Sequence, residues 1–161
     1  MTARPRARSH GARVRERETR YTITRGPVVV DASMAFFWFA NEADPRGAAR
    51  LLETESLLVA PDLMAVEVTN AWWKCLRRRE MDITDVEQAV TRLLALDINW
   101  IAAATLLRPA ARLAAELGHP VYDCVYLALA ASHAAVLATA DERLRRGAER
   151  VGVRLWSARA Y

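Results

Sequence analysis

The stretch VVVDAS, residues 28–33, sets the architecture that we expect for the whole chain. A run of β-branched residues without polar alternation is typical of a strand that is buried on both faces, as in a parallel sheet. An acid, Asp31, directly follows this run. Ligands of open α/β sheets bind beyond the carboxyl ends of the strands, so Asp31 is expected at a functional edge of the sheet.

The rest of the chain alternates short apolar runs with segments of helical pattern, which favours a parallel sheet covered on both faces. We therefore expect an α/β/α sandwich with a central parallel sheet of about five strands. Besides 28–30, strands are expected at 57–60, 99–103, 136–139 and 153–156. Helices are expected after a Ser33 cap, at 44–55, 62–79, 85–96, from 106 or 109 to 117, at 122–134, and after Asp141.

Length and composition favour one folded domain. The chain has 161 residues, of which 53% are hydrophobic and 26% charged, values that are typical of a globular protein rather than a disordered one. Its two cysteines, Cys75 and Cys124, lie far apart in the sequence. They indicate a reducing compartment and argue against a disulfide scaffold or a structural zinc site.

The basic charge is concentrated at the N-terminus. Residues 1–25 hold eight arginines and two glutamates, whereas the remainder holds 15 basic and 17 acidic residues. We expect residues 1–26 to be a flexible Arg-rich extension and residues 27–161 to be a single domain. The extension is interpreted either as an arm for nucleic acid or a partner, or as a plain flexible extension.

Residues 121–140 are long enough to span a membrane, but this segment is rich in alanine and contains Asp123. A charge inside a span costs at least roughly 2.5–3.5 kcal/mol on insertion scales. We therefore expect a soluble cytoplasmic protein without a membrane span.

Four acids stand in otherwise apolar surroundings. Asp31 and Asp141 follow predicted strands, and Asp123 lies in the first turn of a predicted helix. Glu67 lies inside the long helix that follows the second strand, where Asn70 and residues 71 and 74 continue a narrow polar stripe.

Each of the Asp residues also has a simpler explanation: a loop acid at 31, a helix N-terminal charge at 123 and an N-cap at 141. Glu67 has no such ready alternative. If the fold brings these carboxylates within about 5 Å, each pair repels by roughly 3 kcal/mol at an effective dielectric near 20, unless a proton or a cation is shared. Oxygen donors without His or Cys suit Mg²⁺ or Mn²⁺, which serve phosphodiester chemistry.

Four motifs in this order, VVVDAS, PDLMAVEVTNAW, GHPVYDCVYLALA and LATADERL, resemble the PIN-domain ribonucleases, specifically the VapC-type toxins of toxin–antitoxin pairs. The resemblance covers roughly residues 28–156. It implies an Mg²⁺- or Mn²⁺-dependent endoribonuclease that acts on RNA such as tRNA or rRNA, forms a homodimer and is neutralised by a cognate antitoxin. Its catalytic and metal-binding residues would be Asp31, Glu67, Asp123 and Asp141, supported by Ser33, Thr139 and Asn70.

RNA must still be attracted to an acidic site. The candidates for binding it are basic residues beyond Glu67 and beyond Asp141, which grip phosphates or form an ordinary solvated face. They are Lys74, Arg77, Arg78 and Arg79 on the long helix, and Arg143, Arg145 and Arg146 near the C-terminus. Of the adjacent Trp72 and Trp73, one is expected in the core, and exposed aromatic surface here would bind an antitoxin or a second subunit.

Other α/β classes fit less well. A haloacid-dehalogenase-type phosphatase needs a second acid two residues after Asp31, where this chain has Ser33. The glycine-rich motifs of dinucleotide and P-loop nucleotide binding are absent. The serious alternative is a non-catalytic PIN-like module that binds RNA or an antitoxin in a regulatory role.

Overall fold

The computed structural model describes residues 26–40, 43–44 and 46–158. Nearly all of the predicted extension, residues 1–26, therefore lies outside the described residues, and its expected flexibility stays a prediction, as does the boundary at residue 27. No helix in the described part of the chain is long and apolar enough to cross a membrane.

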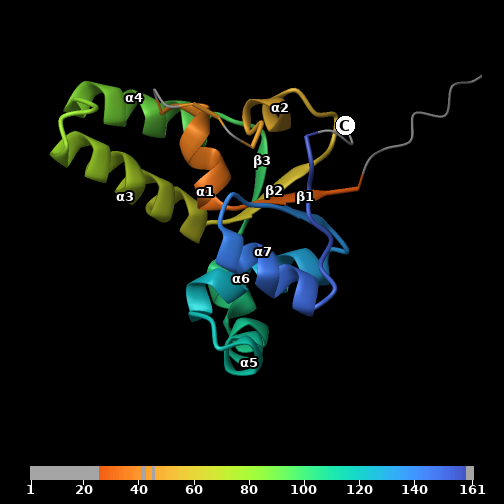
Figure 1. Ribbon diagram of the computed structural model, residues 1–161. Helices are drawn as coiled ribbons and strands as arrows, with labels where there is room; N and C mark the ends of the chain where they lie inside the picture. The colour runs from red at the N-terminus through yellow and green to blue at the C-terminus, as the bar shows by residue number, and fades with distance from the viewer. Residues whose placement is uncertain (1–25, 41–42, 45, 159–161) are drawn as a thin grey trace, which may run out of the picture.

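A parallel sheet forms the centre of the molecule (Figure 1). In the described residues it has four strands in the order β3-β2-β1-β4, and every pairing is parallel. The predicted sandwich is thus confirmed with one strand fewer. The strands are β1 (Val28–Val30), β2 (Leu58–Pro61), β3 (Ile98–Ile101) and β4 (Val136–Ala138).

The fifth strand expected at 153–156 is wrong. This segment makes only a bridge, in which Leu137 donates its N–H to the carbonyl of Arg154 at 2.8 Å and accepts from the N–H of Trp156 at 2.9 Å. Because β4 ends at Ala138, where the chain turns toward the next helix, Leu137 alone is left to pair with it.

Seven α-helices and two short 3₁₀ helices connect and cover the strands in the described residues. The α-helices are α1 (Ala32–Ala35), α2 (Ala49–Leu52), α3 (Leu63–Arg77), α4 (Ile83–Leu94), α5 (Leu107–Leu117), α6 (Val121–Ser132) and α7 (Glu142–Arg150). The 3₁₀ helices are η1 (Phe36–Trp38) and η2 (Ala103–Leu106).

Three predicted helix starts differ from the structure, and one of them is that of α4, which begins at Ile83 after an Asp82 N-cap and not at residue 85. The N-cap of α1 is Asp31 rather than Ser33, because the Asp31 carboxylate accepts the N–H of Ser33. The helix predicted at 44–55 is reduced to α2. Asp44 does accept the N–H groups of Ala48 and Ala49, but Gly47 adopts a positive φ of 72°, which ends any continuous helix before residue 48.

The longest buried segment lies in α6, where residues 124–130 are all buried. This helix packs against β1, β2 and β4, and α5 packs on its other side. In Figure 1, α5, α6 and α7 lie below the sheet, and α1, α3 and α4 lie above it and to its left. The apolar run that surrounds Asp123 in the sequence is therefore a helix that forms part of the core.

The chain order of the strands reverses between β1 and β4. From β1 the chain proceeds through β2 to β3 on one side, and it returns to add β4 on the other side of β1. This is a topological switch point, the place where open α/β sheets bind ligands at the carboxyl ends of their strands. Asp31 follows β1 at this point, and Thr139 follows β4.

Candidate active site

Asp31 is the most enclosed of the four predicted acids, with 7% of its surface exposed. Its Oδ2 atom accepts the hydroxyl of Thr139 at 2.8 Å and both the hydroxyl and the N–H of Ser33. Burial raises the pKa of the Asp31 carboxyl, although these hydrogen bonds oppose the shift. The second carboxylate oxygen accepts no hydrogen bond from the described residues, so it remains available to a ligand.

The hydroxyls of Ser33 and Thr139 join the two sides of the switch point. Ser33 Oγ accepts the N–H of Ala140 at 2.9 Å, and Thr139 Oγ1 accepts the N–H of Asp141 at 3.0 Å. Each hydroxyl therefore donates to the Asp31 carboxylate and accepts from the loop between β4 and α7. The pair fixes Asp141 relative to Asp31.

Asp141 is the N-cap of α7, as one of the sequence interpretations expected. Its Oδ1 accepts the N–H groups of Arg143 at 2.7 Å and Leu144 at 2.8 Å. Capping uses only one carboxylate oxygen, and the residue is exposed. Asp141 can therefore cap the helix and offer its other oxygen to a ligand at the same time.

Asp123 projects from the first turn of α6. Burial, followed by the charges of Asp141 and Asp31, raises its pKa to about 6, and the opposite charge of Arg143 partly offsets this shift. His119 Nδ1 lies 4.0 Å from Asp123 Oδ2. Burial and then Arg143 lower the pKa of His119, so at neutral pH the imidazole is uncharged and does not neutralise Asp123.

Glu67 lies in the second turn of α3 and accepts a hydrogen bond from the hydroxyl of Tyr126. Burial raises the pKa of Glu67, and the charges of Asp31 and Asp123 add to this effect. The backbone of Ala32, at the start of α1, lowers the pKa of the Tyr126 hydroxyl and so opposes part of the effect of its burial. Through its hydrogen bond to Glu67, Tyr126 connects α6 and α3.

Tyr126 was missed by sequence reasoning. It is 1% exposed, and burial together with the charges of Asp31 and Glu67 raises its pKa well above the usual range. The available signal was its spacing, because Tyr126 follows Asp123 by three positions and so lies on the same face of α6. The sequence could not show that its hydroxyl reaches Glu67 on another helix.

The four acids influence one another electrostatically. The charge of Asp31 raises the pKa of both Glu67 and Asp123, and the charge of Asp141 raises that of Asp31 and Asp123. None of the four has a Lys or Arg nitrogen within 4.0 Å among the described residues. The structure therefore brings like charges together without an ion pair to Lys or Arg in the described residues, and only the more distant charge of Arg143 offsets part of the shift of Asp123. Such an arrangement is costly unless protons or a cation are shared.

The oxygen donors fit a hard divalent cation such as Mg²⁺ or Mn²⁺ in their chemistry. In the side-chain arrangement of the described residues, however, no three His, Cys, Asp or Glu groups converge on one point as a metal-binding group. Asp31 and Glu67 each give one oxygen to a hydroxyl group, and Asp141 gives one to α7. Binding of one cation by three of them therefore requires side-chain rotations from this arrangement.

Comparison with protein families identifies the family of this fold. The model of the PIN domain matches residues 28–150. The chain belongs to the PIN-domain family. The match spans all four strands and α1 through α7, and it includes all four acids.

Relatives of this PIN-domain protein include VapC toxins. Ribonuclease VapC3 of Pyrobaculum aerophilum is 33% identical over 121 residues, which cover 73% of this chain and 91% of the relative. The crystal structure of PAE2754 from the same organism has 26% identity and a TM-score of 0.59, covering 76% of this chain and 79% of that one.

Two more distant structures share the fold. Mycobacterium tuberculosis VapC20, described as a sarcin–ricin loop cleaving toxin, has 17% identity and a TM-score of 0.58, covering 74% of this chain and 93% of its own. A toxin–antitoxin complex from Klebsiella pneumoniae has 18% identity and a TM-score of 0.52. The match covers 71% of this chain and 86% of the matched chain. The predicted VapC-type resemblance is confirmed.

Two of the predicted RNA-binding residues border the acids of this PIN domain. Lys74 and Arg78 line a groove of about 520 Å³ together with Ser33 and Asp141. The groove also contains aromatic surface; its remaining walls are Ala32, Phe36, Phe37, Ala71 and Ala140. We call it the Lys74 groove. It joins cationic groups and aromatic rings to the edge of the acid site.

The predicted RNA-binding residues Arg77 and Arg143 do not line the Lys74 groove, although Arg143 donates its backbone N–H to Asp141. Arg77 stacks over the Trp73 ring at 5.2 Å from its centroid, and Arg143 donates to the carbonyl of Gly118 at 2.9 Å. The predicted supporting residue Asn70 is exposed, and its side chain makes no hydrogen bond to any described residue. The structure therefore shows no hydrogen bond between the Asn70 side chain and the acids.

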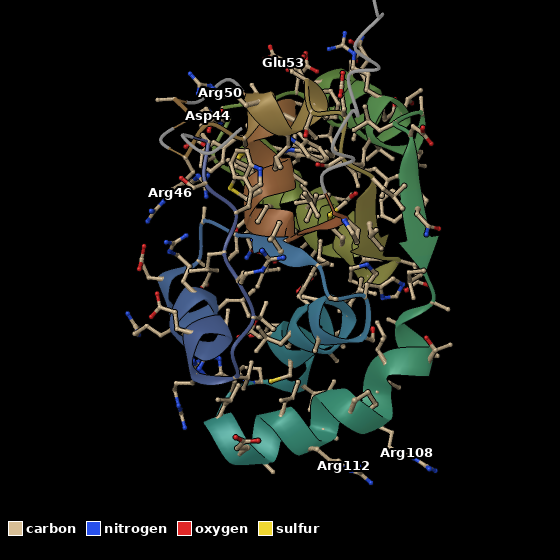
Figure 2. The ribbon with its side chains drawn as sticks, turned by 90° about the vertical axis from the view of Figure 1, so that its right-hand side faces the viewer. Asp44, Arg46, Arg50, Glu53, Arg108 and Arg112 are labelled. Carbon is tan, nitrogen blue, oxygen red and sulfur yellow. The ribbon has the colours of Figure 1, made fainter. Side chains whose placement is uncertain are left out.

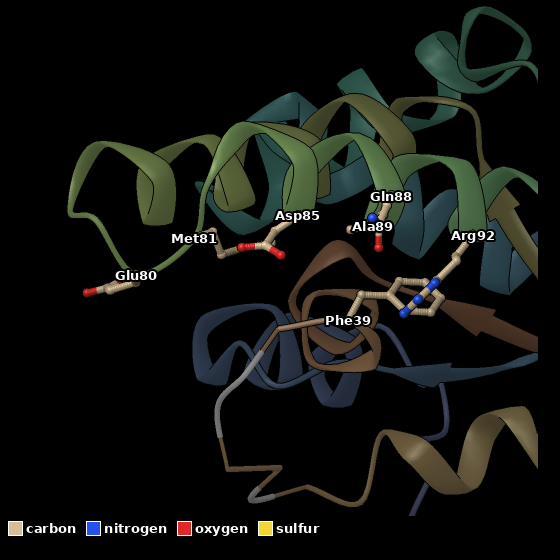
Figure 3. Close-up of a pocket in the computed structure, with 7 residues that line it drawn as sticks. All are labelled: Phe39, Glu80, Met81, Asp85, Gln88, Ala89 and Arg92. Carbon is tan, nitrogen blue, oxygen red and sulfur yellow. The ribbon is translucent and has the colours of Figure 1, made fainter.

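Of the two adjacent tryptophans, Trp72 is fully buried and donates to the carbonyl of Phe36 at 3.2 Å, whereas Trp73 is 44% exposed. The prediction of one core tryptophan is confirmed. Another hollow, of about 120 Å³, lies between Phe39 and the polar side of α4 (Figure 3). Its lining includes none of the predicted site residues: Phe39, Glu80, Met81, Asp85, Gln88, Ala89 and Arg92.

Proposed function

We propose that this PIN-domain protein is a divalent-cation-dependent endoribonuclease toxin that hydrolyses phosphodiester bonds in RNA. The observation that carries the proposal is the gathering of four acids at the carboxyl end of the sheet, where Asp31 follows β1 and makes a hydrogen bond with Thr139 after β4. The charges of Asp31 and Asp141 raise the pKa of Asp123, and those of Asp31 and Asp123 raise the pKa of Glu67. The ribonuclease name of its 33% identical relative supports the reaction class.

The acids have distinct roles in this proposal. Asp31, Asp123 and Asp141 hold Mg²⁺ or Mn²⁺, and Glu67 reaches it directly, through water, or with a second ion. When bound, the cation supplies activation of water and neutralisation of charge on phosphate. Ser33 and Thr139 keep Asp31 oriented by donating to one of its oxygens. The Tyr126 hydroxyl fixes Glu67 in the same way.

The substrate proposed is a structured cellular RNA, tRNA or rRNA. The description of the VapC20 fold relative as a sarcin–ricin loop cleaving toxin makes rRNA a reasonable first substrate to test. The Lys74 groove supports RNA binding, because Lys74 attracts phosphates and the phenylalanine rings offer surfaces on which bases stack, whereas Arg78 is paired with Glu80 at 2.7 Å. Arg77 and Arg143 lie outside this groove and are proposed to contribute to the attraction of RNA around it.

We also propose that a cognate antitoxin silences the protein, that it forms a homodimer, and that it works in the cytoplasm. The toxin–antitoxin complex among its fold relatives motivates the first point. On α3, Val66 is 67% and Trp73 44% exposed, and their spacing of seven residues puts them on one face of the helix. This exposed apolar surface fits a protein partner.

The alternative is a non-catalytic module that binds RNA or an antitoxin. The decisive experiment incubates purified, antitoxin-free protein with end-labelled tRNA and rRNA in Mg²⁺, Mn²⁺ or EDTA, beside an Asp123→Asn variant whose fold is checked by circular dichroism. We expect discrete metal-dependent cuts that disappear in the folded variant. Absence of cuts with either ion, combined with RNA binding, would support the module instead.

A further inference from the structure

A second cavity, slightly smaller than the Lys74 groove, is lined in part by Thr139, whose chain neighbour Ala140 lines that groove. It measures about 490 Å³, within the range of small-ligand sites, and we call it the cationic cavity. Three arginines from separate segments line it, and its full lining is Met34, Arg46, Gly47, Arg50, Thr139, Arg145, Trp156, Ser157 and Ala158. None of the roles proposed above uses this cavity.

The charges around the cavity are unbalanced toward the positive. Arg46 and Arg145 both approach the carboxylate of Glu142, Arg145 at 3.6 Å, and Arg50 donates to the carbonyl of Ala158 at 2.8 Å. Asp44, which Figure 2 labels in the same region of the molecule, gives both of its carboxylate oxygens to backbone N–H groups. A guanidinium has five N–H donors, so one shared carboxylate leaves most of these donors for a ligand.

The cavity adjoins the acid site through shared residues. Thr139 lines the cavity and also donates to the Asp31 carboxylate at 2.8 Å. Arg145 lies one turn after Asp141 on α7, and its backbone N–H donates to the carbonyl of Asp141 at 2.9 Å. A polymer that passes over the acids from the Lys74 groove therefore reaches the three arginines next.

We propose that the cationic cavity binds a backbone phosphate of the RNA strand adjacent to the bond that is cleaved. The inference rests on the proposed nuclease function and deepens it by assigning a phosphate site to Arg46, Arg50 and Arg145. Arginine matches phosphate geometry with paired N–H donors, and a single-stranded phosphate fits a partly open cavity that also holds a tryptophan. Phosphate binding here replaces the Glu142 carboxylate as the partner of Arg46 and Arg145.

The test is the affinity of a fluorescein-labelled single-stranded RNA oligonucleotide for the full chain in EDTA, measured by anisotropy over a series of salt concentrations. The double variant Arg46→Gln/Arg145→Gln is expected to weaken binding about tenfold and to lower the salt slope by about one to two. The matched control is Arg108→Gln/Arg112→Gln, which removes the same charge from exposed positions of α5 (Figure 2). The control is expected to change affinity less than about twofold.

A second pair of variants tests the opposite change, an increase in affinity for RNA. Glu142→Gln removes the carboxylate that competes for Arg46 and Arg145, so RNA binding is expected to strengthen about three- to fivefold. Glu149→Gln makes the same charge change at an exposed position near the other end of α7 and is expected to have little effect. Equal strengthening by both variants would mean a general charge effect and would overturn the assignment of the cavity.

Two further outcomes separate this inference from the proposed function. If the arginine variant and its α5 control weaken RNA binding equally while metal-dependent cleavage persists, the inference fails and the nuclease stands. If wild type cuts no RNA but the binding differences appear, the nuclease fails and the phosphate site stands. Binding of an oligoglutamate peptide that depends on Arg46 and Arg145, without any such dependence for RNA, would overturn the inference in favour of an acidic protein segment.

Discussion

At the scale of single residues, Tyr126 supports Glu67 more directly than any residue of the predicted site does. Its buried hydroxyl donates to the Glu67 carboxylate. Tyr126→Phe would leave this carboxylate without its donor, and an unsatisfied buried polar group costs about 1–3 kcal/mol. We expect a loss of unfolding free energy of that size, measured by urea denaturation.

The same substitution should alter the pH profile of RNA cleavage. The hydrogen bond from Tyr126 lowers the pKa of Glu67, so its loss raises that pKa and moves the acidic limb of the profile to higher pH. Tyr122→Phe is the matched control, because Tyr122 lies on the same helix but is 53% exposed. If both variants behaved like wild type, Tyr126 would be a packing residue only.

Asp123 gives a prediction on stability in the absence of metal. Its pKa of about 6 in the folded protein lies above the ordinary value of 3.8, so its ionisation destabilises the fold at pH values above 6 and not below about 4. Asp123→Asn should therefore be more stable than wild type in EDTA at pH 7.5, by on the order of 2 kcal/mol. The difference should shrink toward zero near pH 4.

This prediction is checked by thermal or urea unfolding of both proteins at several pH values in EDTA. A variant that is less stable than wild type at pH 7.5 would show that the Asp123 carboxylate is stabilised by interactions in the fold. That result would argue against a site whose like charges repel one another until a cation binds.

At the scale of elements, α7 begins at Asp141, which is its N-cap. Substitutions of Asp141 can therefore separate its role in capping the helix from its proposed role in binding a cation. Asparagine caps a helix about as well as aspartate does, whereas alanine costs about 0.5–2 kcal/mol. We expect Asp141→Asn to retain wild-type stability in EDTA and Asp141→Ala to lose about 1 kcal/mol. Both should lose RNA cleavage, because neither supplies a charged oxygen to a cation. Cleavage by the Asn variant at the wild-type rate would remove Asp141 from the metal-binding set.

The elements that sequence predicted well are those with a strong local signal. Short apolar runs located β1 and β4, and the acids that follow them could be predicted to lie at one edge of the sheet because parallel strands share an orientation. The helix around Asp123 was equally clear. The start of α1 was misassigned because both Asp31 and Ser33 are good caps, and the chain order alone does not decide between them.

The features that sequence did not predict are set by contacts between distant segments. The run at 153–156 looks like a strand, but pairing is limited by how far β4 extends, which is a property of its neighbour. The hydrogen bond from Tyr126 to Glu67 joins residues 59 positions apart. Gly47 interrupts the expected helix at 44–55 through its own backbone conformation, and a glycine within a helical pattern leaves that outcome open.

At the scale of the whole molecule, the acids come from four segments that only the complete fold brings together. Asp31 follows β1, Glu67 lies on α3, Asp123 on α6 and Asp141 before α7. No local fragment holds more than a part of the site, so cation binding should be coupled to global folding. A ligand that binds only the folded state raises stability by RT ln(1 + [L]/Kd), about 2.7 kcal/mol at a concentration of 100 Kd.

We therefore expect Mg²⁺ or Mn²⁺ to raise the unfolding temperature at pH 7.5, compared with EDTA at ionic strength matched with KCl. The rise should be smaller at pH 5, because protons compete for carboxylates whose pKa values the fold raises, that of Asp123 to about 6. Asp123→Asn, although more stable without metal, should gain least from it. An equal rise in wild type and variant would mean that the cation acts as a general salt, and the four acids would then have to persist together by sharing protons.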